Sequence, residues 1–235
     1  MKYIAVLFMC NDEHRAKFVA SNFKKHNPDI QLIIYNGGSS ANIKDLCDEY
    51  IEGPNLWHTK TSSPPGSFSY EWFEFLFNLH DRYDPDFLIF LETDVLTTRA
   101  IVNEPKYDIS GACVSCGPIE AVTMYYYWGD HMKYMNREPL ICDHRFHTGM
   151  GGTAFSRNFF EKARNNLLLV KECYDKLAFC CYQDLVITLL ARFSGCTMGD
   201  WSECSDTRGT VRRKDNNWTY ESLNMSCALI HNYKI

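Results

Sequence analysis

Apolar runs of strand length alternate with helical patterns over the first hundred residues, and this alternation restricts the fold more than any other feature. The runs at residues 2–9, 30–35 and 87–91 have the length of buried strands. Between these runs, apolar residues recur at helical spacing in three stretches: Ala16, Val19, Ala20 and Phe23; Ile43, Leu46, Cys47 and Tyr50; and Trp72, Phe75, Leu76 and Leu79. Strands that alternate with helices are typical of a mainly parallel α/β sheet flanked by helices. We therefore expect an α/β fold of this type.

The second part of the chain is less regular but contains the same kinds of element. We expect strands at residues 107–114 and 153–155, helices at 157–165 and 183–194, and a closing apolar segment at 227–230. A chain of 235 residues has the length of one domain, so we expect a single domain over 1–235.

Composition and missing motifs argue against several classes of protein. Hydrophobic residues make up 46% and charged residues 23%, as in ordinary globular proteins, and the net charge of −5 disfavours general nucleic-acid binding. No Gly-x-Gly-x-x-Gly and no Gly-x-x-x-x-Gly-Lys follows a strand, which argues against dinucleotide binding and P-loop hydrolysis. The apolar run at residues 3–9 is too short for a signal peptide or membrane anchor, so we expect a cytoplasmic protein.

Two carboxylates follow the strand at residues 87–91, at Glu92 and Asp94. In a parallel sheet, ligands bind beyond the carboxyl ends of the strands, so the loops at 10–15, 36–40 and 92–98 should open on one edge. Carboxylate and phosphate oxygens are both hard ligands, and the pair therefore suits a divalent metal that grips a diphosphate. An ordinary polar turn after a strand would explain the same two residues.

Four segments, in this order, resemble the motifs of GT-A-type glycosyltransferases, nucleotide-sugar enzymes with a single Rossmann-like domain. They are Glu92-Thr93-Asp94, similar to the Asp-x-Asp signature; His147-Thr148-Gly149-Met150-Gly151-Gly152, similar to the glycine-rich segment beside the donor sugar; Tyr182-Gln183-Asp184-Leu185, similar to the acidic motif; and His231-Asn232-Tyr233-Lys234, similar to the C-terminal metal-binding histidine. The sequence departs from the family pattern in two places, because Glu92 stands for Asp and Gln183 stands where many relatives carry Glu. The small size also resembles the minimal transferases of large DNA viruses of algae, which would place the protein in the host cytoplasm.

The resemblance implies a metal site and divides the chain by function. Mn²⁺, or Mg²⁺, would be held by Asp94, Glu92 and His231, and Lys234 could add a positive charge beside the same diphosphate. Residues of about 1–100 would form the nucleotide-binding half, and residues of about 101–235 the acceptor-binding half. A surface histidine near a frayed end of the chain is the alternative interpretation of His231.

The resemblance also implies that Asp184 removes the proton of the acceptor hydroxyl, which would invert the anomeric centre. An acid at a helix start is equally explained by the helix dipole, and without a carboxylate at that place retention becomes the better expectation.

The remaining candidate residues are assigned by position. Donor contacts are expected from Cys10, Asn11, Arg15, Asn36, Lys60, Thr93, Gly151, Gly152 and Lys234. Acceptor or sugar contacts are expected from Tyr125, Trp128, His147 and Trp201. Core packing is an alternative role for each aromatic residue, and a tight turn is an alternative role for the two glycines.

The sequence therefore predicts a metal-dependent glycosyltransferase, a hexosyl- or pentosyltransferase, that moves a sugar from a nucleotide donor such as a UDP-sugar to a carbohydrate acceptor. Two alternatives stay open. One is a nucleotidyltransferase that forms the sugar nucleotide, although the loop at 10–15 carries two acids and no glycine. The other is a carbohydrate-binding protein that keeps the fold without catalysis.

Overall fold

A central sheet organises the computed structural model, which describes residues 1–10, 12–40, 42–58, 67–68, 70–115, 146–148, 151–168, 171, 187–188, 190–191, 193–206, 210–214, 217–221 and 226–231. Within these residues the central sheet has seven strands, in the order β12 (Met198–Asp200), β8 (Ile109–Gly111), β11 (Ala154–Ser156), β6 (Phe87–Leu91), β1 (Tyr3–Met9), β2 (Gln31–Asn36) and β3 (Glu49–Glu52). Strands β6, β1, β2 and β3 run parallel, and so do β8 and β12. Strand β11 is antiparallel to both of its neighbours, β6 and β8. The predicted α/β fold with a mainly parallel sheet is therefore confirmed.

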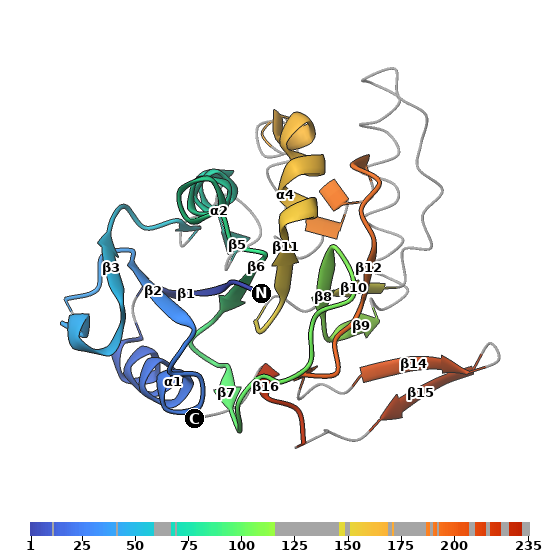
Figure 1. Cartoon of the computed structure of the whole chain (residues 1–235), viewed down its shortest axis with the longest axis horizontal. Helices are drawn as coiled ribbons and strands as arrows, with labels where there is room; N and C mark the ends of the chain where they lie inside the picture. The colour runs from blue at the N-terminus through green and yellow to red at the C-terminus, as the bar shows by residue number, and fades with distance from the viewer. Residues whose placement is uncertain are drawn as a thin grey trace.

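Helices cover both faces of this sheet (Figure 1). Helix α1 (Glu13–His26) lies on one face, and α2 (Tyr70–Tyr83) and α4 (Arg157–Ala163) lie on the other. The buried side of α1 consists of Ala16, Val19, Ala20 and Phe23, and these are the positions expected from its helical spacing. On the opposite face, α2 and α4 bury mainly aromatic side chains: Trp72, Phe73, Phe77, Phe159 and Phe160. The fully apolar strands between the two layers are buried on both faces, which a parallel sheet requires.

Short strands form four further sheets among the described residues. A three-stranded sheet has the order β13 (Cys204–Asp206), β16 (Leu229–His231) and β7 (Leu96–Thr97). The two-stranded pairs are β10 (Phe146–Thr148) with β9 (Cys113–Ser115), β14 (Thr210–Lys214) with β15 (Asn217–Glu221), and β4 (Trp57–His58) with β5 (Ser67–Phe68). None of the described helices is long and apolar enough to cross a membrane.

The helix predicted from Ile43, Leu46, Cys47 and Tyr50 is wrong. The segment forms one short 3-10 turn, η1 (Lys44–Leu46), and then the edge strand β3. Between them, the carboxylate of Asp48 accepts hydrogen bonds from the backbone N–H of Leu32 at 2.7 Å and from Lys24 Nζ at 2.9 Å. These contacts hold the segment against β2, so pairing at the sheet edge overrides the helical spacing.

Two other predicted elements differ in their limits. The strand expected at residues 107–114 is divided into β8 and β9, because β8 joins the central sheet while β9 pairs with β10. The helix expected at 157–165 ends as α4 at Ala163 and continues as a second 3-10 turn, η2 (Arg164–Asn166). The described positions between 187 and 193 are helical, and Gly195 follows with a φ of 65°, a conformation that glycine adopts without strain.

Candidate active site

The carboxyl ends of β6, β1, β2 and β3 meet at one edge of the central sheet, since these strands are parallel. Glu92 and Asp94 lie in the turn that leaves β6 at this edge, and the turn is closed by a hydrogen bond from the N–H of Val95 to the carbonyl of Glu92 at 3.2 Å. His231 is the last residue of β16, so it reaches the turn from a different sheet.

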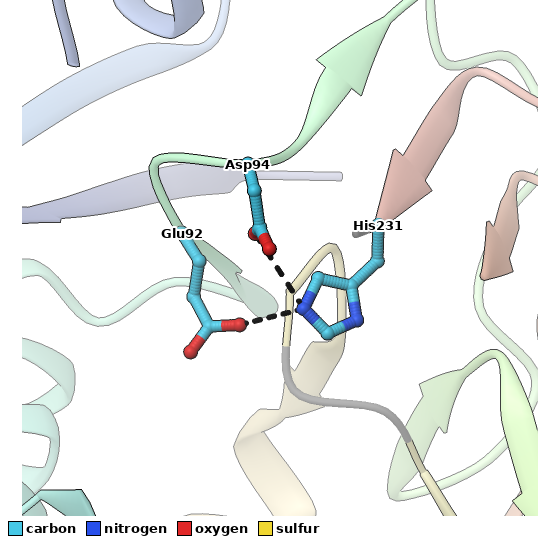
Figure 2. Close-up of side chains that lie close together, drawn as sticks. All are labelled: Glu92, Asp94 and His231. Carbon is cyan, nitrogen blue, oxygen red and sulfur yellow. Dashed lines mark ion pairs between the residues drawn. The ribbon is translucent and has the colours of Figure 1, made fainter. Parts of the chain in front are cut away.

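The three side chains point toward one another (Figure 2). His231 Nε2 lies 2.8 Å from Glu92 Oε2 and 3.6 Å from Asp94 Oδ1. One ligand atom from each residue lies within 4.8 Å of the others. The His231 side chain is 8% exposed, that of Glu92 is 16% and that of Asp94 is 29%, so the cluster opens to solvent on the side of the acids.

Strand β16 is held next to the acidic turn by its neighbours. It pairs antiparallel with β7, which follows Asp94 after a single residue, and parallel with β13. The N–H of Thr98 donates to the carbonyl of Ala228 at 2.9 Å, and the N–H of Thr97 donates to Asn22 Oδ1 on α1 at 3.0 Å. The residues that carry the candidate site are thus tied both to each other and to the main body of the fold.

Gly151 lies directly behind the His231 ring. A Cβ atom at this position would be 2.3 Å from His231 Cδ2 and 2.8 Å from Val95 Cγ2, so a larger residue would displace the ring. Gly152 has a φ of 85°, and a Cβ there would lie 3.0 Å from Cys204 Sγ. The two glycines were expected beside the donor sugar, and that role stays a prediction. In the structure, the missing side chains leave space for the His231 ring and for Leu229 on β16.

The cluster has a suitable size and donor set for one divalent cation. Two carboxylates and one imidazole suit Mn²⁺, because carboxylates favour Mg²⁺ and Mn²⁺ whereas imidazole favours later transition metals. Ligands about 2.1 Å from an ion in octahedral geometry lie roughly 3 to 4 Å apart. The ligand atoms of Glu92, Asp94 and His231 lie within a comparable span, at most 4.8 Å.

Asn36, which was expected on the nucleotide side, lies at the same edge of the sheet. Asn36, at the end of β2, is 6% exposed, and its side chain forms hydrogen bonds with the backbone of the loop that follows β2. Asn36 Oδ1 accepts from the N–H of Ser39 at 2.7 Å, and Asn36 Nδ2 donates to the carbonyl of Ser39 at 2.7 Å. An open hollow of about 570 Å³ lies beyond β2 and β3, lined by Asn36, Ser39, Asn42, Lys44 and Glu52 among others.

The other residues expected to contact the donor differ in burial and in their neighbours, and three of them lie outside the described residues. Cys10 is half-buried after β1, where its Sγ lies close to Gly37. Arg15 is in the first turn of α1, and its Nε lies 3.2 Å from Asp12 Oδ2. Thr93 is half-buried between the two acids. Asn11, Lys60 and Lys234 lie outside the described residues.

On the expected acceptor side, Trp201 is part of the core. It is 3% exposed, and its indole N–H donates to the carbonyl of Asn103 at 3.0 Å. This burial fits core packing, which was the alternative to the expected contact with an acceptor. His147 lies on β10, where only the backbone is described, and Tyr125, Trp128 and Asp184 lie outside the described residues.

Three residues that contact one another between the segment after β7 and the start of β13 were not anticipated from the sequence: Arg99, Asn103 and the fully buried Glu203. Arg99 Nη1 lies 2.7 Å from Glu203 Oε2, and the N–H of Asn103 donates to Glu203 Oε1 at 2.9 Å. No motif or periodicity marks these residues, because their partners are about a hundred residues away along the chain.

The fold resembles solved structures of known proteins, although the sequence matches none of the family models or curated proteins. The galactosyltransferase LgtC, in a complex with donor and acceptor sugar analogues, superposes with a TM-score of 0.55 at 16% identity, over 98% of this chain and 86% of LgtC. The chain has the fold of LgtC. An active-site mutant of LgtC gives the same TM-score of 0.55 at 14% identity, over 98% of this chain and 86% of that chain. The narrower resemblance to transferases of algal viruses finds no support in these structures.

Proposed function

We propose that the protein is a metal-dependent glycosyltransferase that moves a sugar from a nucleotide donor, a UDP-sugar, to a carbohydrate acceptor. The observation that carries the proposal is the convergence of Glu92, Asp94 and His231 at the carboxyl edge of the sheet. The similarity to LgtC also supports the proposal, since LgtC is a galactosyltransferase, was solved with donor and acceptor analogues bound, and shares this fold.

The proposed chemistry follows from the charge that develops during sugar transfer. The bond between the anomeric carbon and a phosphate oxygen breaks, and negative charge accumulates on the leaving diphosphate. A divalent cation, Mn²⁺ or Mg²⁺, would supply the compensating positive charge when bound. Asp94, Glu92 and His231 would hold this cation, and the burial of His231 keeps its imidazole fixed for that purpose.

The two halves of the chain would divide the substrates between them. Residues of about 1–100 contribute β1, β2, β3, β6 and the acidic turn, so the nucleotide would lie along their common edge. The acceptor would be bound by residues of about 101–235, and Lys234 would add a positive charge near the diphosphate. The hollow beyond β2 and β3 adds polar groups at the nucleotide end of this edge.

Asp184 is the proposed general base, because the resemblance places it in the acidic motif. With Asp184 as base the product has the inverted anomeric configuration. The configuration of the first-formed product can be determined by proton NMR, and a retained configuration would exclude this role for Asp184.

Donor hydrolysis with and without Mn²⁺ tests the proposal directly. We expect turnover to require the metal and Asp94→Asn to reduce it by about 100-fold or more, since the metal ligand is lost. Asp84→Asn is a matched control, because Asp84 precedes the other end of β6 and its φ of 45° suits asparagine as well. Metal-independent turnover that survives Asp94→Asn would overturn the mechanism.

Two other outcomes would identify the alternative functions. Pyrophosphate release from UTP would favour formation of the sugar nucleotide. Glycan binding that is unchanged by a chelator, without any binding of nucleotide, would favour a non-catalytic carbohydrate-binding protein.

A further inference from the structure

Glu203 is a fully buried carboxylate that no step of the proposed reaction uses. It is 0% exposed and directly precedes β13. Its side chain meets two residues of the segment that follows β7: Arg99 Nη1 lies 2.7 Å from Oε2, and Asn103 donates to Oε1 from its backbone N–H at 2.9 Å and from its side-chain amide. Its backbone carbonyl accepts from the N–H of Leu229, the first residue of β16, at 2.8 Å.

These contacts join the two parts of the chain that carry the candidate metal ligands. Arg99 and Asn103 belong to the segment that continues from Glu92 and Asp94 through β7. Leu229 is two residues before His231, and Arg99 Nε also donates to the carbonyl of Ser226 at 2.8 Å, just before β16. Glu203 is therefore a shared anchor for the acidic turn and for the histidine strand.

The strands between these parts are too short to fix their relative position alone. Strand β7 has two residues, and β13 and β16 have three residues each, whereas strands in globular proteins usually have five or six. A ladder of this length contributes few hydrogen bonds. The Glu203 carboxylate adds side-chain contacts to these ladders: its Oε1 accepts two hydrogen bonds from Asn103, and its Oε2 forms an ion pair with Arg99, whose side chain is 39% exposed. Hydrogen bonds to a charged acceptor are shorter and stronger than those between neutral groups.

We propose that Glu203 is a positioning residue for the metal site: through Arg99 and Asn103 it holds β16 against β7 and so sets His231 at the correct distance from Asp94 and Glu92. This inference rests on the proposed function. It assigns Glu203 no contact with the metal or the substrate.

Glu203→Gln tests this role, because the change keeps the shape of the side chain and removes its charge. The measurement is the Kd for Mn²⁺, determined by the loss of the electron paramagnetic resonance signal of the aqueous ion on titration with protein. We expect Glu203→Gln to bind Mn²⁺ about 10-fold more weakly than the wild type. This is the lower end of the loss caused by changing groups that hydrogen-bond metal ligands directly, because Glu203 acts on the ligands through Arg99 and Asn103.

Asp108→Asn is the matched control for a general loss of stability. Asp108 is also a buried carboxylate with a cationic partner, Lys162, but it connects β8 and α4 and has no contact with β7, β13 or β16 in the described residues. We expect this variant to bind Mn²⁺ with wild-type affinity at a temperature where both variants are folded. A milder change, Arg99→Lys, keeps the positive charge and loses the planar fork, and should weaken binding less than Glu203→Gln does.

The outcomes separate this inference from the proposed function. Wild-type Mn²⁺ affinity in folded Glu203→Gln overturns the inference alone, and so does an equal loss of affinity in Asp108→Asn. A wild-type protein that binds no Mn²⁺ overturns the metal site and the inference together. If Glu203→Gln does not fold, the Arg99→Lys result decides, and an unchanged Kd in that variant overturns the inference.

Discussion

Gly151 shows how a single side-chain position controls the candidate site. The His231 ring occupies the space where any other residue would place its Cβ. We predict that Gly151→Ala moves the ring and weakens Mn²⁺ binding by about 10-fold or more, with a loss of about 1–3 kcal/mol in the free energy of unfolding from overpacking. Isothermal titration calorimetry and urea unfolding give the two values.

Gly199→Ala provides the control for that prediction. A Cβ at Gly199 would lie 2.3 Å from Tyr107 Cε2, the same distance from a ring atom as at Gly151. Gly199 is on β12, an edge strand of the central sheet that carries none of the three candidate ligands. The substitution should cost less free energy of unfolding than Gly151→Ala, because the Tyr107 ring is 39% exposed and can move, and it should leave the Mn²⁺ affinity unchanged. Equal effects of both alanines on the affinity would contradict the role given to Gly151.

Asp108 shows how one carboxylate can connect several elements. It lies before β8 and accepts from the N–H of Thr197 at 2.8 Å, from Asn158 Nδ2 on α4 at 2.6 Å and from Lys162 Nζ at 3.3 Å. Burial raises the pKa of Asp108, but these donors outweigh it and hold the pKa below its ordinary value of 3.8. The charged form of Asp108 therefore stabilises the attachment of α4 and of the segment before β12 to β8.

We predict that Asp108→Asn lowers the free energy of unfolding by about 2–4 kcal/mol at pH 7, because charged hydrogen bonds are lost and Lys162 loses its partner. A carboxyl group with a lowered pKa in the folded state stabilises the protein above the pKa of the unfolded state, and this contribution disappears as the pH falls through the folded pKa. The difference between wild type and variant in urea unfolding should thus shrink as the pH falls below 3.8. A difference that stays constant down to pH 3 would contradict this account.

At the level of elements, long periodic segments could be predicted and short ones could not. Helices α1 and α2 could be predicted from their apolar spacing, because each is fourteen residues long and buries one face along that length. The segment at 43–50 has the same spacing over fewer residues, and there the contacts of Asp48 with Leu32 and Lys24 decide in favour of an edge strand. Strands of two or three residues, such as β7 and β13, depend on partners elsewhere in the chain and carry no local signal.

Across the whole molecule, the residue types of the candidate site could be predicted, but the structure that supports them could not. Glu92, Asp94 and His231 were expected near one another from the resemblance, and the structure places their ligand atoms within 4.8 Å. Glu203 gave no signal, because its contacts join residues 99–103 with 203 and 226–229. Contacts between residues so far apart in the sequence form only in the folded chain, and no short sequence pattern predicts them.

Ligand binding should stabilise the whole fold if the metal and nucleotide bind as proposed. At a hundredfold excess over Kd a ligand adds about 2.7 kcal/mol to the free energy of unfolding, which for a chain of this size raises Tm by about 5–10 °C. We predict such a shift with UDP and Mn²⁺ together, measured by differential scanning fluorimetry. The shift should be absent with EDTA and in Asp94→Asn, and an equal shift in that variant would show that the cation binds elsewhere.

The order of the candidate ligands along the chain has a consequence for how the proposed metal site forms during protein synthesis. During translation the acidic turn leaves the ribosome more than a hundred residues before His231 does. A nascent polypeptide would carry the parallel strands β1, β2, β3 and β6 long before it contained all three candidate ligands. If the site binds a cation as proposed, the ion would be bound late in maturation, and a product interrupted ahead of residue 231 would lack one of the three proposed ligands however well its first hundred residues had folded.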